Sequence, residues 1–302
     1  MRYPQVGIFA LGTPENDYLE LDLQSGKTLE ALIRALVNLK SFHSEIGVNL
    51  VVAFRPSLWS ALQPGEHPAD AADWTEPITG VDGFTMPVTP HDAWVWVSGP
   101  DRAAVFDSVL EIRNAVADIA DVATELTGWH YKQGRDLTGF IDGTENPQLI
   151  EAPSIATVPA DQPGAGSCIL IVQQWDHDIR AWTSLSTKEQ ENVFGRSKED
   201  SIEMPDDVKP PTSHVSRTTV DRDGVERKIF RHNVAYGNTG RHGTLFVGFS
   251  ADQWRQMEML RRMAGVDGIR DALTHFTTPK TGAAYVVPST SVLAQYVVDD
   301  DD

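Results

Sequence analysis

The chain is poor in cysteine and has no long apolar segment. Cys168 is the only cysteine among 302 residues, so no intrachain disulfide can form. No run approaches the roughly 20 apolar residues that a membrane-spanning helix needs. The N-terminal apolar stretch is also too short for a secretory signal. These absences argue against a disulfide-stapled secreted protein and against a membrane partner, and we expect a cytoplasmic protein.

Positive charge is scarce as well. The chain has 25 Lys and Arg residues against 43 Asp and Glu residues, which gives a net charge of −18. An acidic surface repels phosphate backbones, and no stretch rich in Lys and Arg compensates for it. The composition therefore argues against nucleic acid as a partner.

The sequence motifs of several common enzyme classes are missing. None of the 9 histidines has the H-E-x-x-H spacing, and one cysteine cannot form a Cys/His cluster, so a zinc site has little support. There is no G-x-x-x-x-G-K-[ST] phosphate loop, no glycine fingerprint between a strand and a helix, and no G-x-S-x-G. The absence of these motifs argues against a hydrolase, a kinase and a dehydrogenase.

What the chain does contain is a strong hydrophobic pattern in two similar halves. In the first half we predict strands at 6–11, 18–23, 49–54 and 93–98. A helix is predicted from Thr28 to Phe42, because its aliphatic residues recur at helical spacing on one face. A second helix is predicted to start at Pro100. The polar segment 63–92 is predicted to be a connecting loop.

The second half repeats the plan. We predict strands at 168–175, 214–220, 226–237 and 243–249, the second and third paired across the turn DRDG. One helix is predicted to begin at Ser186, which forms a capping box with Glu189, and to end at Gly195. Another is predicted after the last strand, capped by Ser250 and Gln253.

Neither half shows a regular parallel β-α-β alternation, which favours an α+β fold of two related units with antiparallel sheets. The segment IEAPSIATVPADQPGAGS is rich in Pro, Ala and Gly and is a natural joint. We therefore divide the chain into an N-terminal unit, residues 1–150, and a C-terminal unit, residues 151–302.

A few polar residues stand out against this framework. Asp142 lies in the tight bend GRDLTGFIDGTENP, and His214 opens the segment HVSR. Arg231 and Asn233 fall on one face of a strand, with His232 on the other, because side chains alternate. Each alone is more often structural: Asp-Gly is a common turn pair, and a single histidine is usually a satisfied structural residue. Together, an acid, an arginine and a lone histidine suit a haem site.

The motifs GFIDGTENP, HVSR, FRHN and TGAAYVVPS resemble, in order and spacing, those of the dye-decolourising peroxidases, in their compact bacterial B/P-type subfamily. The resemblance extends from about residue 5 to 290. It implies two tandem ferredoxin-like units, related to the dimeric α+β barrel proteins, with one haem b per chain in the second unit. It also implies a peroxidase that uses hydrogen peroxide to oxidise bulky dyes and phenols through a ferryl intermediate.

The resemblance also implies roles for individual residues. His214 would be the proximal ligand of the haem iron, and Asp142, Arg231 and Asn233 would act on peroxide from the distal side. The remaining cofactor-binding residues would be Phe246 in the distal pocket, Gly143 and Thr144 in the acid-glycine motif, and Asp271 as the carboxylate that accepts the other imidazole N–H of His214. Asp267 is a rival for this last role.

Three further expectations concern function. An aspartate transfers protons at lower pH more readily than a histidine, so we expect an acid pH optimum. Small-molecule donors, with Mn²⁺ among the candidates, would supply electrons, and we expect a homodimer or a higher homo-oligomer. The alternatives are a haem-handling protein without turnover, which would not need Asp142 and Arg231 together, and a structural α+β module without cofactor.

Overall fold

The computed structural model describes residues 2–39 and 47–298. Among these residues, one antiparallel sheet of ten strands dominates the fold, in the order β10-β12-β11-β6-β1-β5-β2-β14-β7-β13. Its strands are β1 (Glu15–Leu23), β2 (Asn49–Phe54), β5 (Ala93–Gly99), β6 (Ala120–Trp129), β7 (Cys168–His177), β10 (Phe230–Arg231), β11 (Val234–Gly237), β12 (His242–Ser250), β13 (Thr277–Pro279) and β14 (Ala283–Val287).

Helices and short hairpins surround the sheet. The α-helices are α1 (Leu29–Val37), α2 (Pro56–Leu62), α3 (Arg102–Val116), α4 (Ala152–Ala156), α5 (Ile179–Thr183), α6 (Thr187–Phe194), α7 (His214–Thr218), α8 (Gln253–Ala264) and α9 (Thr290–Leu293). Short 3₁₀ helices occur at η1 (Val6–Phe9), η3 (Val81–Gly83), η4 (Ala272–His275) and η5 (Ala294–Tyr296). Two small hairpins pair β3 (Ile78–Thr79) with β4 (Thr85–Met86), and β8 (Asp221–Arg222) with β9 (Val225–Glu226).

The sheet consists of two ferredoxin-like units that close on each other. The first unit has the strand order β6-β1-β5-β2 and the second β14-β7-β12-β11, which is the same order of fourth, first, third and second strand. Pairing of β6 with β11 and of β2 with β14 joins the units into a barrel. The predicted α+β fold of two ferredoxin-like units is confirmed. The unit boundary at residue 150 stays a prediction.

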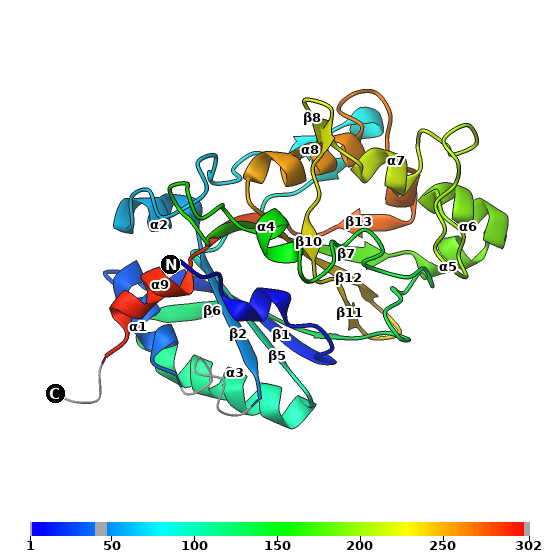
Figure 1. The fold of residues 1–302 in the computed structure, drawn as a ribbon. Coiled ribbons are helices and arrows are strands. Elements are labelled where there is room, and N and C mark those ends of the chain that lie inside the picture. The colour runs from blue at the N-terminus through cyan, green and yellow to red at the C-terminus, as the bar shows by residue number, and fades with distance from the viewer. Residues whose placement is uncertain (1, 40–46, 299–302) are drawn as a thin grey trace.

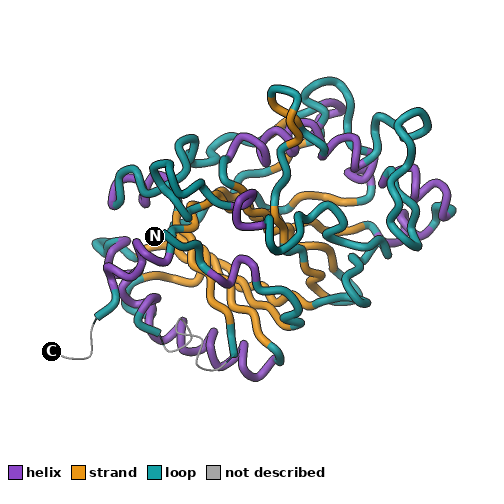
Figure 2. Tube along the Cα trace, viewed as in Figure 1, coloured by secondary structure: helices purple, strands orange, loops and turns teal. Residues whose placement is uncertain are grey.

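Side-chain alternation separates an inner core from an outer one. Leu245, Val247 and Phe249 of β12 point into the barrel with Trp94, Trp96 and other buried residues of the strands. The outer faces carry the helices: α1 and α3 cover the first unit, and α8 lies over β12 of the second. Figure 1 shows these helices on the outside, and Figure 2 shows the strands gathered in the middle of the molecule.

Most of the predicted elements are present. In α1 the five residues predicted to share a face are buried together, namely Leu29, Leu32, Ile33, Leu36 and Val37. Part of the predicted extension of this helix to Phe42 lies outside the described residues. The capping box of Ser186 and Glu189 forms, and Gly195 ends α6 in the left-handed conformation at φ 84°. Cys168 is buried in β7, within the predicted strand at 168–175.

The predicted strand at 6–11 is wrong. Residues Val6–Phe9 form the 3₁₀ helix η1, with Ile8 fully buried in the inner core of the barrel. The side chain of Gln5 bonds the backbone N–H and C=O of Val52, at 2.9 and 2.8 Å. A closed barrel offers this segment no free edge, so it crosses the strands instead of pairing with them.

The predicted strand at 214–220 is also wrong. His214–Thr218 forms helix α7, because the buried Ser213 caps it by accepting the N–H of Ser216. The Thr218 and Thr219 hydroxyls then bond the carbonyls four residues earlier, at 2.8 and 2.9 Å, which satisfies the threonines within the turn. The turn DRDG joins only the small strands β8 and β9, and the predicted strand at 226–237 is broken into β10 and β11.

Three smaller predictions need correction. Helix α8 is capped by Asp252, whose carboxylate accepts the N–H of Arg255, and not by Ser250 with Gln253. Pro100 precedes the Asp101 cap of α3 instead of starting the helix. The segment 63–92 is more than a loop, because Trp74 and Met86 are buried against the outer core.

Candidate active site

A large cavity lies on the outer face of the second unit. Its floor is the outward side of β7 and β12, and its walls come from α7, α8, η4 and the loop 134–147. The cavity and its mouth contain about 1160 Å³ of space not filled by protein atoms. Apolar side chains line much of it, including Phe194, Phe246, Met259, Leu260 and Met263. Such a lining suits a large, flat, mostly apolar ligand.

His214 enters this cavity from α7. Its Nδ1 lies 2.7 Å from Oδ2 of Asp271, which is fully buried, so Nδ1–H donates to the carboxylate. The other oxygen of Asp271 accepts the N–H of Leu273 at 2.8 Å, which holds the carboxylate in place. The Phe194 ring meets the imidazole edge-on at 5.9 Å. The arrangement leaves the second imidazole nitrogen, Nε2, available to a ligand in the cavity.

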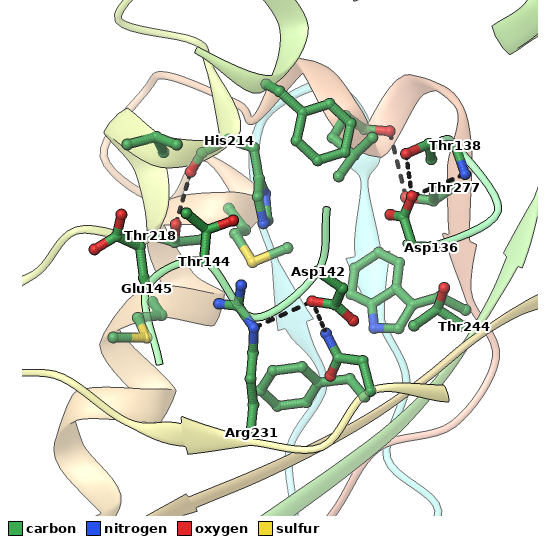
Figure 3. Close-up of a pocket in the computed structure, with 18 of the residues that line it drawn as sticks. Asp136, Thr138, Asp142, Thr144, Glu145, His214, Thr218, Arg231, Thr244 and Thr277 are labelled. Carbon is green, nitrogen blue, oxygen red and sulfur yellow. Dashed lines mark hydrogen bonds and ion pairs between the residues drawn. The ribbon is translucent and has the colours of Figure 1, made fainter. Parts of the chain in front are cut away.

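Three polar side chains form a cluster on the opposite side of the cavity (Figure 3). Oδ1 of Asp142 accepts Nδ2–H of Asn233 at 3.1 Å and the N–H of Gly143 at 2.7 Å. Nε of Arg231 lies 3.4 Å from the same oxygen and makes an ion-pair contact without the geometry of a hydrogen bond. The carboxylate thus has several donors, and it faces His214 across the space between them.

The loop that carries Asp142 is fastened to the second unit. Asn146 donates to the carbonyl of Arg231 at 2.8 Å, and its carbonyl oxygen accepts the Arg231 N–H at 3.0 Å. Gly143 adopts φ 75°, a conformation that a residue with a side chain rarely takes, so the bend needs glycine there. The sequence Asp-Gly-Thr-Glu-Asn therefore sets Asp142 beside the backbone that presents Arg231.

His232 turns away from the cavity into the barrel. Its ring lies 4.9 Å from that of Trp96, and its Nε2 donates to the carbonyl of Ile8 at 2.6 Å. Burial lowers its pKa to about 4, although the bond to Ile8 acts in the other direction. As predicted, His232 therefore points to the opposite side of the strand from Arg231 and Asn233.

The remaining residues predicted to bind the cofactor lie in or beside the large cavity, but Asp267, the rival of Asp271, does not. Phe246 and Thr144 line the large cavity, and Thr144 also lies 2.9 Å from the hydroxyl of Ser201. Gly143 lines a smaller neighbouring cavity instead. Asp267 does not contact His214 but pairs with Arg217 at 2.5 Å, so Asp271 alone of the two rivals is placed beside the imidazole.

Sequence reasoning missed other residues of the cavity. Gln173 is fully buried in the floor, and both atoms of its amide lack a partner among the described residues. Gln173 lies two residues before Trp175 in β7, so both side chains are on the outward face of the strand. The strand pattern alone cannot show that a cavity covers this face. Asp136 also lines the cavity, and its position six residues before Asp142 was the available signal.

The residues present fit a haem group. A single imidazole with a carboxylate behind it, a broad apolar lining and an opposed acid-arginine pair are the features that a haem peroxidase pocket needs. The amide of Gln173 adds buried polar atoms in the cavity floor that have no hydrogen-bond partner among the described residues, and Nε of Arg231 has only its ion-pair contact with Asp142. The fold and this site define a haem protein of the peroxidase class.

Comparison with known proteins agrees. The sequence profile of the Dyp-type peroxidase C-terminal family matches residues 133–292. A dye-decolorizing peroxidase from Mycolicibacterium paratuberculosis is 35% identical over 300 residues, which cover 95% of this chain and 84% of that protein. The chain belongs to the Dyp-type peroxidase family, and it is a haem-dependent peroxidase.

Solved structures have the same fold. DypB from Rhodococcus jostii superposes with a TM-score of 0.87 at 31% identity, covering 96% of this chain and 97% of that one. A variant of that protein in complex with heme is equally similar, at a TM-score of 0.87 and 31% identity, over 97% of this chain and 99% of the other. An encapsulated DyP-type peroxidase from Mycobacterium smegmatis gives a TM-score of 0.88 at 29% identity, covering 99% of both chains.

No helix in the described part of the chain is both long enough and apolar enough to cross a membrane.

Proposed function

We propose that the chain binds one haem b in the large cavity, with Nε2 of His214 as the protein ligand of the iron, and reduces hydrogen peroxide on the side of Asp142. The single observation that carries this proposal is the opposition of His214 and Asp142 across one cavity. Bound haem supplies the redox chemistry, taking two oxidising equivalents from each peroxide. A carrier or storage protein would need His214 but not the polar cluster that faces it.

Each polar residue has a distinct role in this proposal. Asp271 accepts Nδ1–H of His214 and so gives the imidazole more electron density to share with iron. Asp142 takes the proton from one oxygen of peroxide and returns it to the other. Arg231 keeps a positive charge beside the oxygen that leaves, since a guanidinium stays protonated. Asn233 holds the carboxylate of Asp142 through their 3.1 Å bond.

Bulky donors act from outside the pocket in this proposal. The polar cluster and Phe246 line the space around Asp142, and bound haem would occupy most of the large cavity, so a bulky dye would have little access to the peroxide. Electrons therefore come from dyes, phenols or Mn²⁺ at the edge of the haem or through aromatic side chains. We further propose a cytoplasmic homo-oligomer, at least a dimer, as the working form.

A reconstitution experiment tests the proposal. The purified chain is titrated with haem b while the Soret band is followed, and the haem type is checked as its pyridine complex. The loaded protein is then mixed with hydrogen peroxide and an anthraquinone dye at pH values from about 3 to about 10. We expect saturation at one haem per chain and turnover that is greatest at acid pH. Haem binding without dye oxidation would favour a haem-handling protein, and a rate that peaks above pH 8 would exclude Asp142 as the proton carrier.

A further inference from the structure

A second carboxyl group lies close to the proposed peroxide site. Asp136 comes from the same loop as Asp142, and both line the large cavity (Figure 3). The hydroxyl and the backbone N–H of Thr138 both donate to Oδ1 of Asp136, the latter at 2.9 Å. Oδ2 has no such bond to Thr138, and one oxygen of the carboxyl group is drawn facing the cavity.

The same two aspartates also line a smaller cavity. It contains about 660 Å³ of unfilled space and shares Arg231 and Asn233 with the large one. It extends from the polar cluster to Leu11, which is 55% exposed, and to His130. With haem in the large cavity, this smaller cavity would remain as a polar path between the surface and Asp142.

The environments of the two carboxyl groups differ. Asp142 accepts an amide N–H and a backbone N–H and lies beside the guanidinium of Arg231. The donors to the side chain of Asp136 are neutral groups of its own loop, namely the hydroxyl and N–H of Thr138 and the backbone N–H of Phe140. Burial raises the pKa of Asp136 to about 6, the charge of Asp142 adds to this shift, and the bonds from Thr138 oppose it. Asp136 is therefore a carboxyl group that can hold a proton in weakly acid solution.

Other charged and titratable groups around Asp136 do not neutralise it by contact. Lys198 is near enough to interact electrostatically with Asp136, but its ammonium group bonds Oε1 of Gln190 at 2.6 Å. His177 lines the large cavity and His130 the small one, and no hydrogen bond or ion pair joins either of them to Asp136 among the described residues. Asp136 therefore exchanges protons through the cavities and not through a fixed partner.

The proposed reaction requires a group that can take up protons from solvent, and a carboxyl group of this kind can do so. Hydrogen peroxide takes up two electrons and two protons to give two water molecules. Asp142 can move the proton that peroxide brings from one oxygen to the other, which breaks the O–O bond without net proton uptake. When the donor supplies electrons alone, the two further protons must come from solvent.

We propose that Asp136 is a second proton-transfer residue, which takes protons from solvent through the smaller cavity and supplies them to the peroxide site beside Asp142. This inference rests on the proposed function, since it adds a step to the same site. The proposal predicts that the two residues act in different steps. Asp142 transfers the proton during cleavage of peroxide, and Asp136 supplies the protons that are taken up later, during reduction.

Infrared titration tests the protonation of Asp136 without turnover. The haem-loaded protein is followed between pH 4 and 8 through the C=O band of protonated carboxylic acids, with Asp136→Asn used to identify the signal. We expect a band that disappears near pH 6 and is absent in the variant. In Asp142→Asn the same band should be lost at lower pH, because the like charge has gone. In Thr138→Val it should persist to higher pH, because a bond that favours the carboxylate has gone.

Stopped-flow kinetics then test the role, with ferrocyanide as a donor that brings electrons and no protons. In Asp136→Asn the reaction with one equivalent of hydrogen peroxide should stay within about twofold of wild type, while reduction by ferrocyanide slows on the order of 100-fold. Asp136→Glu should restore part of the second rate.

Two results would overturn the proposal. One is the absence of any carboxyl band that depends on Asp136, which would show that the group stays ionised. The other is an equal loss of both rates in Asp136→Asn with no rescue by Asp136→Glu, which would show a structural role. Neither result touches the peroxidase proposal, because that proposal is tested by turnover of the wild-type protein and by variants of Asp142, not by variants of Asp136.

Discussion

Nδ1 of His214 lies 2.7 Å from the buried carboxylate of Asp271, and this contact decides what the imidazole can do. A histidine that donates one N–H to a carboxylate has its other nitrogen fixed as the ligand atom. The Asp271 backbone N–H is in turn bonded to the carbonyl of Met263 at the end of α8. Helix α8 thereby positions the acid, the acid orients the imidazole, and the imidazole faces the cavity.

Replacing Asp271 by Asn should weaken the electron donation of His214. An amide accepts the imidazole N–H less strongly than a carboxylate does, so less negative charge develops on the ring. We expect a more positive reduction potential of the haem and a reaction with hydrogen peroxide that is about 10 to 100 times slower. Spectroelectrochemical titration and stopped-flow absorption measure the two quantities.

Asp267→Asn is the matched control for that variant. Asp267 lies four residues away in sequence and pairs with Arg217 instead of His214. Its replacement should leave the reduction potential unchanged. A shift as large as that of Asp271→Asn would show that the potential responds to any lost negative charge nearby, and not to the bond with His214.

Arg231→Leu should slow the reaction with peroxide without preventing haem binding. The variant removes the positive charge beside Asp142 and leaves the imidazole on the other side intact. Loss of one preorganised donor of this kind costs about 100- to 1,000-fold in rate. Arg241→Leu is the control, because Arg241 pairs with Asp176 on the surface. An Arg231 variant that reacts at the wild-type rate would remove this residue from the proposed mechanism.

Asn146→Ala should release the loop of Asp142 from β10. Its amide makes both bonds to the Arg231 backbone, so the variant frees the link between the two units at this point. Small displacements of a reacting group cost up to about 100-fold in rate, and two lost bonds cost about 1 to 3 kcal/mol of stability. Urea unfolding and the peroxide rate measure the effects. Asn238→Ala, which removes an amide bonded to two N–H groups of an exposed turn, should leave the peroxide rate unchanged.

His232 should make the fold sensitive to acid. Its pKa is about 4 in the folded chain, because burial disfavours the charged ring, against about 6.5 in an unfolded chain. Between these values the unfolded chain binds the proton and the folded chain does not, so stability is full above pH 6.5 and falls toward pH 4. The loss is roughly 2 to 3 kcal/mol for this group.

His232→Gln gives the measurement. Glutamine can still donate to the carbonyl of Ile8 but does not titrate, so the free energy of unfolding should fall less steeply between pH 6.5 and 4. His177 has a pKa lowered to about 4 by burial as well and stays in place, so part of the slope remains. A slope equal to that of wild type would mean that His232 is already protonated in the folded protein.

The repeated hydrophobic pattern was enough to predict an α+β fold of two related units, and the family resemblance added that these units are ferredoxin-like. Helix α1 and strand β2 are amphipathic or continuously apolar over several residues, and both were predicted in place. The closure of the barrel depends on pairings between distant strands, such as β6 with β11, which no local pattern encodes. Strand β6 itself was missed, since half of its residues are exposed and it has no continuous apolar pattern.

The sequence also predicted some features of the candidate site and missed others. Asp142, His214, Arg231 and Asn233 carry a resemblance that named them before any geometry was known. The local structure at His214 was nevertheless wrong, because a run of β-branched residues indicates a strand while Ser213 caps a helix. Asp136 and Gln173 were missed because their roles depend on cavities, which form only when α7, α8 and the loop 134–147 meet the sheet.

A rapid-mixing absorption spectrum tests our proposal that His214 and Asp142 act from opposite sides of one haem. The haem-loaded protein and its Asp142→Asn variant, which should bind haem equally, are each mixed with one equivalent of hydrogen peroxide. We expect a fast change of the Soret band in the wild type, and a change slower by about 100-fold or more in the variant. Equal rates in the two proteins, or no spectral change in the wild type, would contradict it.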